Sequence, residues 1–371
     1  MRGLILAGPR SVEFRADLPA PVIERPGDAI IEVALAGICG SDLHTYEERE
    51  PVGWGVIPGH EAAGRVIATG SGVVDFRVGD RVFLPFTTSC GRCAPCLRGL
   101  SARCETSRLF GWAPPVGTPP SAGAASPAAG GAGLQGTQAE YVRVPDADTT
   151  LLLLPAERSD AEGVLLGDNF TTGYFCARNG LSDARAGSPV VAVLGCGAVG
   201  LSALVCARHL GAGAVLAVDP VESRRATALR LGADLAASPD DASAALADLA
   251  SRTPVRAAGA DVVLEAVGSR ASRSLALRLA AAGATLSSVG VATDDFGFSP
   301  ADLYDGNLTW RVGRCPVRSL APQVLGALAA GLRIPVDDLA PESPIPLEEG
   351  PAAYEKFAAR TGGGLKPLLA P

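Results

Sequence analysis

A glycine-rich stretch in the middle of this 371-residue chain constrains its fold more than any other feature. An apolar run at 189–194 leads into Gly195-Cys-Gly-Ala-Val-Gly200, and a helical pattern follows at 201–210. A second apolar run, Ala214–Val218, ends in Asp219. A GxGxxG motif that follows a strand, opens a helix and precedes an acidic residue is typical of a dinucleotide-binding βαβ unit. The stretch therefore predicts a doubly wound parallel sheet of the α/β class.

The same stretch predicts how the dinucleotide binds. The glycines let the backbone approach the pyrophosphate, which lies on the partial positive charge of the following helix N-terminus. Asp219 can accept hydrogen bonds from both ribose hydroxyls and would repel a 2′-phosphate, whereas Arg224 and Arg225 could bind one. Because Asp219 is acidic, NAD is expected rather than NADP. The expected cofactor-binding residues are Gly195, Gly197, Ala198, Val199, Gly200, Asp219, Arg224, Val267 and Val289.

Strand and helix patterns divide the chain into three segments. Residues 1–155 hold short alternating runs between Gly, Pro and Asp, which predict a β-rich, barrel-like or sandwich-like domain. The βα alternation occupies residues 156–300, where Val267 and Val289 lie at strand ends, the edge at which an open parallel sheet binds its ligand. Residues 301–371 lose this alternation and are expected to return to the first domain.

Four clustered cysteines form a second informative feature. They are Cys90, Cys93, Cys96 and Cys104. Four thiolates at this spacing can enclose one tetrahedral zinc ion and leave no open position, which indicates a structural site. Unrelated buried cysteines or a redox pair are weaker interpretations, because four clustered cysteines exceed what a redox pair needs. We therefore expect a structural zinc lobe over residues 88–105.

Cys39 and His60 form a third feature. The chain has only 3 histidines, and both His44 and His60 follow Cys39 closely. A thiolate and a neutral imidazole suit zinc, and a set of three protein ligands leaves the open position of a catalytic site. Alone, the pair could equally be a glycine-rich turn with a buried cysteine and a solvated histidine. Both residues fall at the edges of predicted strands, in loops.

Asp168 is a candidate partner for that pair. It lies in the run Ala161–Asn179, which predicts a helix capped by Gly180, and Thr172 shares its face at i+4. An acid among apolar neighbours is unusual unless it is paired or bound to a metal. The alternative is a carboxylate satisfied by a local hydrogen bond or by an arginine.

Composition narrows the classes of function. The chain has 32 basic and 39 acidic residues, a net charge of -7, which argues against sequence-independent nucleic-acid binding. Apolar runs are too short for a membrane span or a signal peptide, so a cytoplasmic location is expected. There, cysteines serve as metal ligands or buried thiols rather than disulfides. Cys176, Cys196, Cys206 and Cys315 are therefore expected in the core. The segment Ala113–Gly133, almost wholly Ala, Pro, Gly and Ser, predicts a long surface loop.

Together these motifs make the chain similar to the zinc-dependent medium-chain alcohol dehydrogenase family. The resemblance covers essentially the whole chain. It rests on GICGSDLH at 37–44, PGHEAAGRV at 58–66, GDRV at 79–82, the four-cysteine lobe, and VLGCGAVG with Asp219. The family has a GroES-like catalytic domain interrupted by a Rossmann domain, and the resemblance implies that fold.

The resemblance also implies roles for individual residues. Cys39 and His60 become catalytic zinc ligands, with Asp168 of LLGDNFTTGY as the third ligand and Thr172 beside the nicotinamide. Glu61 matches the family's acid that approaches the zinc or lies behind its ligands. Ser41 and His44 match a proton relay. The structural zinc ligands are implied to be Cys90, Cys93, Cys96 and Cys104.

The implied activity is reversible hydride transfer between an alcohol and NAD(H). One catalytic zinc would polarise the oxygen of a small alcohol, aldehyde or ketone, and a second zinc would be structural. The proton would pass from Ser41 through the cofactor ribose to His44 and solvent. A homodimer or homotetramer is expected, with no nucleic-acid or membrane partner.

Three other functions stay open. A zinc-free quinone or enoyl reductase would not need the Cys39, His60 and Asp168 set. The segment GLQGTQAEYV at 133–142 looks like the bacterial branch of formaldehyde dehydrogenases and dismutases, which suggests an enzyme with tightly bound NAD. A zinc- or NAD-binding protein without catalysis would have no use for a complete relay.

Overall fold

The computed structural model describes residues 1–49, 54–112, 134–182, 188–252, 259–292, 294–360 and 365–371. Internal contacts divide the chain into two units. The first comprises Met1–Asp168, Pro316–Pro322 and Val336–Pro371, and the second comprises Asn169–Cys315 and Gln323–Pro335. The loop expected at 113–133 lies outside the described residues. None of the described helices is both long and apolar enough to cross a membrane.

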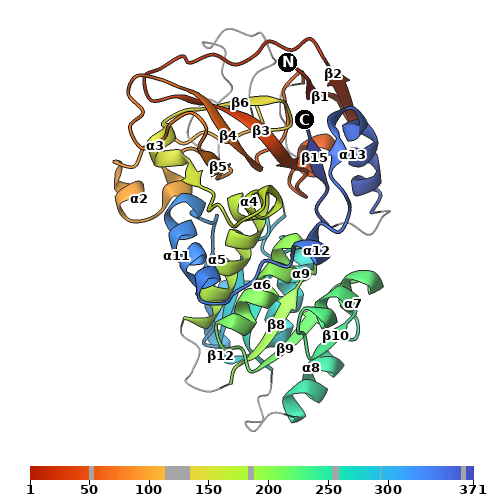
Figure 1. Cartoon of the computed structure of the whole chain (residues 1–371). Coiled ribbons are helices and arrows are strands. Elements are labelled where there is room, and N and C mark those ends of the chain that lie inside the picture. The colour runs from red at the N-terminus through yellow and green to blue at the C-terminus, as the bar shows by residue number, and fades with distance from the viewer. Residues whose placement is uncertain (50–53, 113–133, 183–187, 253–258, 293, 361–364) are drawn as a thin grey trace. The chain divides into compact units, whose positions relative to one another are not determined.

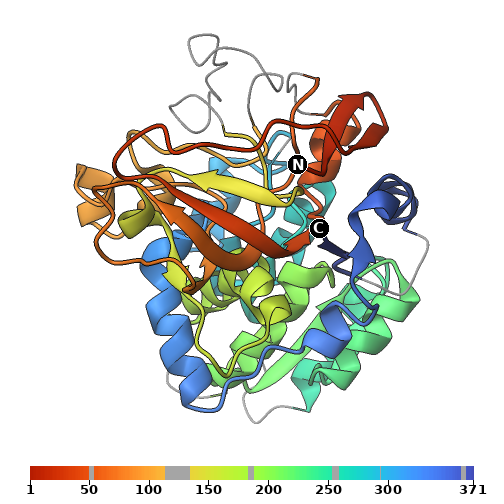
Figure 2. The same ribbon diagram turned by 45° about the horizontal axis from the view of Figure 1, so that its top comes forward.

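The first unit is built on a mixed, mostly antiparallel sheet with the order β14-β15-β3-β4-β5-β7, and β6 also pairs with β3. Its strands are β3 (Ala29–Gly37), β4 (Ala62–Thr69), β5 (Arg81–Leu84), β6 (Tyr141–Val144), β7 (Leu152–Leu153), β14 (Ile345–Pro346) and β15 (Leu368–Ala370). Figure 2 shows β6, in yellow, beside β3. A separate hairpin joins β1 (Gly3–Gly8) to β2 (Ser11–Arg15).

Alternation of side chains explains how this sheet forms its core. In β3, Ile31 and Val33 are buried and the intervening Glu32 is exposed, which is the period of a half-buried strand. The helices of this unit are α1 (Asp42–Tyr46), α2 (Ala94–Leu97), η1 (Ser101–Arg103), α3 (Ala147–Thr150), α4 (Asp160–Gly167), α12 (Val336–Leu339), η3 (Leu347–Glu349) and α13 (Gly350–Ala358). The helix α11 (Val317–Ala329) contributes residues to both units.

The second unit contains a six-stranded parallel sheet in the order β10-β9-β8-β11-β12-β13. The strands are β8 (Val190–Leu194), β9 (Ala214–Val218), β10 (Leu235–Ala237), β11 (Ala260–Glu265), β12 (Ala280–Ser288) and β13 (Thr309–Val312). Numbered within the unit, this order is 3-2-1-4-5-6, the strand order of a Rossmann fold. From β8 the next strands in sequence, β9 and β10, lie on one side, and the later strands β11, β12 and β13 lie on the other. The point between β8 and β11 is therefore the topological switch point, where these folds bind a dinucleotide.

Helices and apolar strands form the core of the second unit. Its helices are α5 (Asn169–Leu181), α6 (Ala198–His209), α7 (Glu222–Arg230), α8 (Ala242–Ser251), α9 (Arg270–Leu279) and α10 (Pro300–Asp305), several of which are labelled in Figure 1. Every residue of β8 and β9 is buried, as expected for parallel strands covered on both faces. Burying each Val or Leu side chain there contributes about 1.5–3 kcal/mol.

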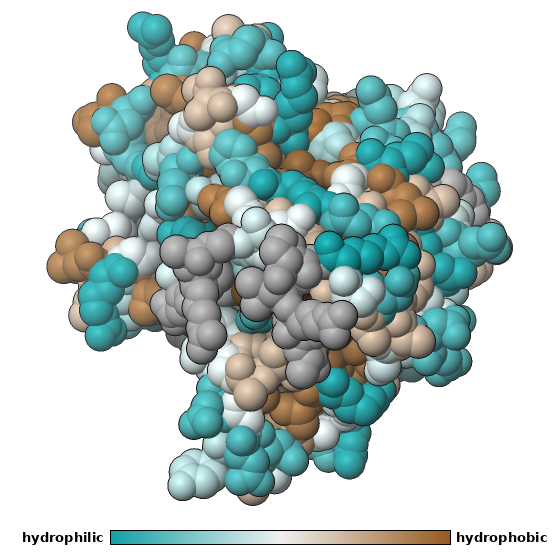
Figure 3. Space-filling model, turned by 90° about the horizontal axis from the view of Figure 1, so that it is seen from below, coloured by the Kyte–Doolittle hydropathy of each residue, from teal (hydrophilic) through white to brown (hydrophobic). Residues whose placement is uncertain are grey.

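Surface and core separate clearly by residue type. The four cysteines expected in the core are at most 1% exposed, which confirms that prediction for Cys176, Cys196, Cys206 and Cys315. Figure 3 shows hydrophilic and hydrophobic side chains interspersed on the face seen from below. Large apolar side chains that reach the surface occur in both units, for example Leu97 on α2 of the first unit and Leu229 on α7 of the second.

The structure differs from the sequence-based expectation at two places. The βα alternation does not end near residue 300, because Ser299 caps α10 and β13 then joins β12 in parallel. The run Ala161–Asn179 is not one helix: α4 ends at Gly167 and α5 begins at Asn169. Gly167 lies against the backbone of Leu84, where a Cβ would come within 2.3 Å of the carbonyl oxygen. Asp168 is therefore the residue at a break, with φ −149° and ψ −80°, rather than a residue inside a helix.

Candidate functional site

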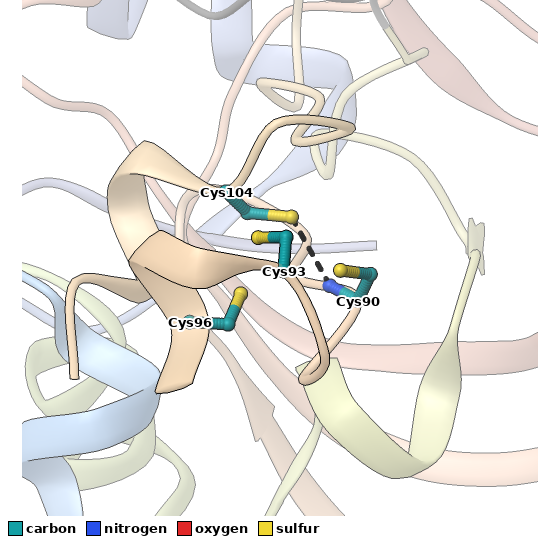
Figure 4. Close-up of side chains that lie close together, drawn as sticks. All are labelled: Cys90, Cys93, Cys96 and Cys104. Carbon is teal, nitrogen blue, oxygen red and sulfur yellow. Dashed lines mark hydrogen bonds between the residues drawn. The ribbon is translucent and has the colours of Figure 1, made fainter. Parts of the chain in front are cut away.

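The four clustered cysteines lie together in the first unit. Their sulfur atoms come within 4.8 Å of one another, and Figure 4 shows them pointing toward a common centre. Cys104 is buried and the other three are partly exposed. Four sulfur donors around one point match the closed ligand set of a structural zinc. The structure thus brings together Cys90, Cys93, Cys96 and Cys104, the residues predicted for this role.

Local backbone geometry shapes this lobe. Gly91 has φ +70°, and a Cβ at this position would lie 2.7 Å from Thr149 Cγ2, so only glycine fits the turn after Cys90. Cys93 caps α2, whose first turn carries Pro95, and the backbone N–H of Cys90 donates to Cys104 Sγ at 3.2 Å. Ser89 and Thr149 exchange hydrogen bonds to each other's carbonyl oxygens, which tie the lobe to α3.

The thiols of the lobe differ in acidity without a metal. Burial raises the pKa of Cys90, but hydrogen bonds from the backbone of Arg92 and Cys93 outweigh it and lower that pKa to about 6. Burial and the neighbouring thiol of Cys93 raise the pKa of Cys96 to about 12. Thiolate is the form that binds zinc, and the backbone hydrogen bonds around Cys90 favour that form at this sulfur.

A second group of metal-ligand side chains lies in the same unit. One donor atom each from Cys39, His60, Glu61 and Asp168 falls within 4.8 Å of the others, and all four residues are buried. Cys39 Sγ lies 3.7 Å and His60 Nε2 lies 3.6 Å from Asp168 Oδ2. Sulfur, imidazole nitrogen and carboxylate oxygen are the donor types of zinc sites, so the chemistry of this set fits that metal.

Three separate segments bring this group together. Cys39 follows the end of β3, and His60 and Glu61 precede β4, its antiparallel neighbour. The backbone N–H of Gly37 donates to Glu61 O at 3.1 Å and joins the two loops. Asp168 reaches the group from the break after α4, whose N-terminus Ser159 and Glu162 cap reciprocally. The break turns the Asp168 side chain out of the helical path.

Hydrogen bonds orient the imidazole of His60. Asp42 Oδ1 lies 3.2 Å from His60 Nδ1, and Asp42 Oδ2 accepts from the backbone N–H of Cys39 at 2.8 Å. With Nδ1 directed at Asp42, Nε2 is the ring nitrogen left to face a metal. Gln138 donates to Gly37 O at 3.1 Å and to Asp42 Oδ2 at 3.4 Å, and its Oε1 accepts from the Tyr354 hydroxyl at 2.9 Å. A buried polar chain thus extends from α13 to His60.

The charges within the group perturb its titration. Burial lowers the pKa of His60, but the charge and hydrogen bond of Asp42 and the hydrogen bond of Asp168 raise it well above the ordinary value. Burial raises the pKa of Asp168, and the hydrogen bond and charge of His60 overcome this and lower it to about 2. Asp168 is therefore a carboxylate at neutral pH, ready to bind a cation.

Lys366 is a functional candidate that sequence reasoning missed. Its ammonium donates to both oxygens of Glu61 at 2.8 Å and to Ile38 O at 3.1 Å. Burial raises the pKa of Glu61 and the positive charge of Lys366 lowers it; burial has the larger effect, and the pKa is about 7. No local pattern marks this lysine, because its partner lies 305 positions away in the chain. Gln138 and Tyr354 were missed as site residues for the same reason.

The two predicted relay residues lie beside the metal group. Ser41 Oγ is 3.2 Å from His60 Nε2, and Ser41 is partly exposed. His44 is on α1 one turn later, where its backbone N–H donates to Ser41 O at 3.0 Å, and it is also partly exposed. A hydroxyl next to the metal group and an imidazole one helical turn further along the chain are residue types that can pass a proton.

The predicted cofactor residues lie in the second unit. Gly195 has φ +89°, and a Cβ on Gly200 would lie 1.7 Å from Gly195 O, so both positions require glycine. Gly197 caps α6, whose first residues Ala198 and Val199 are partly exposed. The β8–turn–α6 arrangement therefore presents helix N–H groups at the C-terminal edge of the parallel sheet, where an anion binds.

Asp219 lies at the end of β9, the neighbouring strand. Its carboxylate accepts from the backbone N–H of Cys196 at 2.8 Å and of Val221 at 2.9 Å. Arg224 Nη1 is 4.0 Å from the same carboxylate, and Arg225 donates to Asp219 O at 2.9 Å. The carboxylate is thus fixed next to the glycine motif, and the nearer arginine is placed to pair with it.

The remaining predicted residues lie at other strand ends or on α5. Val267 is exposed after β11, and Glu265 Oε1 accepts from its backbone N–H at 2.8 Å. Val289 is partly exposed after β12, and its N–H donates to Glu265 O at 2.9 Å. Thr172 is buried on α5 of the second unit, whereas the metal group belongs to the first unit.

Comparison with known families agrees with this geometry. The profile of the alcohol dehydrogenase GroES-like domain matches residues 25–156, and that of the zinc-binding dehydrogenase matches residues 198–329. The chain belongs to the zinc-dependent medium-chain alcohol dehydrogenase family. It therefore combines a GroES-like domain with a Rossmann domain in a zinc-binding oxidoreductase, as the sequence motifs predicted.

Individual relatives span most of the chain. "Zinc-type alcohol dehydrogenase B" of Aspergillus flavus is 37% identical over 97% of this chain and 79% of its own length. The solved structure of "Alcohol dehydrogenase TADH from Thermus sp. ATN1" has a TM-score of 0.86 and 36% identity, covering 100% of this chain and 99% of its own. A "Glutathione-independent formaldehyde dehydrogenase" of Pseudomonas aeruginosa is 35% identical over 63% of this chain and 58% of its own length.

Proposed function

We propose that this protein is a zinc-dependent alcohol dehydrogenase that transfers hydride reversibly between an alcohol and NAD. One observation carries the proposal: a sulfur, an imidazole and a carboxylate, from Cys39, His60 and Asp168, converge in a buried group. A purely structural zinc has four tight ligands and needs no relay, and the fourth side chain of this group, Glu61, is paired with Lys366. In this group a partly exposed hydroxyl, Ser41, lies beside the ligands instead.

Cys39, His60 and Asp168 would hold the catalytic zinc. Bound there, zinc supplies Lewis acidity, which makes an alcohol easier to deprotonate and a carbonyl easier to reduce. The residues of the chain do the rest. Asp42 keeps Nδ1 of His60 protonated, so that Nε2 faces the ligand set. Burial of the whole group excludes water from it, which strengthens its electrostatic interactions.

Ser41 and His44 would move the proton that alcohol oxidation releases. Ser41 Oγ, 3.2 Å from His60 Nε2, would accept the proton released at the metal group while its own hydroxyl proton moves on toward His44 and solvent. An imidazole whose ordinary pKa is about 6.5 exchanges protons with solvent readily near neutral pH. Thr172 would contact the nicotinamide from α5.

The second unit would bind NAD. The pyrophosphate would lie on the N-terminus of α6, against Gly195, Gly197 and Gly200. Asp219 favours the ribose hydroxyls of NAD and repels the 2′-phosphate of NADP. Arg224, 4.0 Å from the same carboxylate, is the residue that would hold a 2′-phosphate if NADP bound instead.

The four-cysteine lobe would hold a second, structural zinc. Its four sulfurs, which point toward a common centre, would fill the ligand positions of a tetrahedral zinc and leave none for a substrate. Each chain would then contain two zinc ions with different tasks.

A formaldehyde dehydrogenase or dismutase with permanently bound NAD is the second candidate. The Pseudomonas relative described as a glutathione-independent formaldehyde dehydrogenase, at 35% identity, favours the formaldehyde dehydrogenase part of this candidate. The two candidates differ in one simple respect: a dismutase keeps its cofactor through dialysis, whereas an ordinary dehydrogenase releases it.

Zinc content and NADH production in one preparation test the proposal. We expect two zinc ions per chain, no NAD after dialysis, and NADH release with members of a panel of primary, secondary, aromatic and terpenoid alcohols. NADP⁺ in place of NAD⁺ should give a much lower kcat/KM. Bound NAD after dialysis, with aldehyde dismutation, would favour the second candidate. Full zinc content without turnover of any alcohol or aldehyde would contradict both.

A further inference from the structure

Glu61 and Lys366 form a buried ion pair beside the metal group. The two side chains are 0% and 2% exposed. Both oxygens of Glu61 accept from Lys366 Nζ at 2.8 Å, and the third ammonium donor goes to Ile38 O at 3.1 Å. An ammonium has three donors. These three contacts therefore account for the whole hydrogen-bonding capacity of Lys366.

Backbone contacts fix the pair in place on both sides. The N–H of Ile38 donates to Pro367 O at 3.0 Å, next to Lys366. A Cβ on Gly37 would lie 2.0 Å from Glu61 Oε2, so the carboxylate occupies space left by a missing side chain. The position of the Lys366 ammonium is thus set by the backbone just before Cys39 as well as by Glu61.

Glu61 is nevertheless close enough to bind the metal. Its carboxylate lies within 4.8 Å of the donor atoms of Cys39, His60 and Asp168. Four protein ligands close a tetrahedral site, as in structural zinc sites, whereas three leave a position for substrate. Whether Glu61 joins the ligand set therefore decides whether the site can accept a substrate.

We propose that Lys366 is a positioning residue that holds Glu61 off the metal, so that Cys39, His60 and Asp168 bind it alone. A buried carboxylate requires a cationic or hydrogen-bonding partner. Lys366 is that partner, and it holds the carboxylate in the space beside Gly37. The charge of Glu61 is then balanced by the ammonium of Lys366 rather than by the metal. This inference rests on the proposed function, because it takes a catalytic metal at this site as given.

Cobalt in place of the catalytic zinc reports the ligand set directly. Visible absorption of Co²⁺ depends on the number and type of its ligands, and the full-length protein is used throughout. In Lys366→Met we expect Glu61 to move onto the metal, which changes the cobalt spectrum. Imidazole, a probe of an open metal position, should then bind at least about tenfold more weakly, the scale seen when groups behind metal ligands are lost. Lys366→Arg, which keeps the cation, should retain the wild-type spectrum.

The double variant Glu61→Gln/Lys366→Met is the matched control. It removes both charges together, so no buried charge is left unpaired. We expect its cobalt spectrum and imidazole affinity to match the wild type. If Lys366→Met fails to fold, this variant alone decides: a changed spectrum would show that Glu61 is a ligand in the wild type and would overturn the inference.

Other results separate the inference from the proposed function. A Lys366→Met protein with the wild-type spectrum and imidazole affinity contradicts the positioning role. A wild-type chain that takes up no cobalt at Cys39, His60 and Asp168 contradicts the proposed function itself.

Discussion

The two metal-ligand groups of the first unit are built in opposite ways. All four sulfurs of the lobe come from one short segment, Cys90 to Cys104, and three of the four cysteines are partly exposed. The second group takes its ligands from three segments, and all of them are buried. Around it lie further buried charges and amides, notably Asp42, Lys366 and Gln138, whereas the lobe is tied down by backbone and threonine contacts.

This contrast teaches what each group is suited to do. A closed set of four like donors fixes a loop and offers nothing to a substrate. A set of three unlike donors, oriented by hydrogen bonds to groups behind them, holds a metal in a defined geometry with a position to spare. We therefore expect damage to the lobe to appear in stability and damage to the second group to appear in chemistry. Four variants test this contrast.

The largest effect is expected for Asp168→Asn. Loss of the carboxylate charge should weaken metal binding at the second group and lower kcat/KM at least about 100-fold, because ligand loss exceeds the 10–100-fold cost of losing a group behind a ligand. Zinc analysis should find about one zinc per chain with the lobe filled. Asp160→Asn, on α4 but outside the group, should keep both zincs. A full zinc complement and wild-type rate in Asp168→Asn would remove it as a ligand.

Ser41→Ala should retain both zincs and the cofactor but slow turnover about 100-fold or more, the usual contribution of positioned proton transfer. The hydroxyl lies 3.2 Å from His60 Nε2, and alanine cannot carry a proton. Steady-state kinetics should show a lower kcat with little change in KM. Ser41→Thr, which keeps a hydroxyl, should recover most of the rate, and an unimpaired alanine variant would exclude the relay.

Cys93→Ser should act on stability instead. If zinc at the lobe is present at 1,000 times its Kd, losing it removes about 4 kcal/mol of stabilisation. Thermal unfolding should begin at a lower temperature, while activity per catalytic zinc stays near the wild-type value. Cys206→Ala removes a core thiol but no lobe ligand and should keep both zincs. Abolished activity in a folded Cys93→Ser protein would contradict the prediction that the lobe affects stability and not catalysis.

The smallest effect is expected for Tyr354→Phe. It deletes the hydroxyl that donates to Gln138 at 2.9 Å, a hydrogen bond worth about 1 kcal/mol. Competition with a chelator should show metal affinity at the second group reduced by about tenfold or less. Tyr174→Phe, whose hydroxyl accepts from Gln323 in the second unit, is the matched control and should leave that affinity unchanged. Equal effects of the two variants would mean that the hydrogen-bonded series from Tyr354 to His60 does not contribute to metal affinity.

The same contrast explains what could be predicted from sequence. The lobe and the glycine motif depend on short spacings, so Cys90, Cys104 and Gly195 could be recognised locally. Strand edges likewise placed Cys39 and His60 in loops. The break at Asp168 was not predicted, and the residue before it, Gly167, packs against the backbone of Leu84, a contact with a distant segment that no local pattern reveals.

Contacts between distant segments account for the other differences. Lys366 and Tyr354 reach the second group from the C-terminal part of the chain, and only folding brings them there. β13 was missed because its four residues are partly exposed or exposed, so they lack the apolar run that marked β8 and β9. A strand at the edge of a sheet gives a weaker sequence signal than a central one.

Stepwise metal removal tests the division of labour between the two groups most directly. A chelator is added in increments while zinc content, alcohol oxidation and thermal unfolding are followed in the same samples. Mixed sulfur, nitrogen and oxygen donors should release zinc before four thiolates do. We predict that the first zinc to leave abolishes activity and leaves the fold intact, and that the second leaves only as the protein loses stability. Activity that survives loss of the first zinc, or simultaneous loss of both metals, would contradict this division.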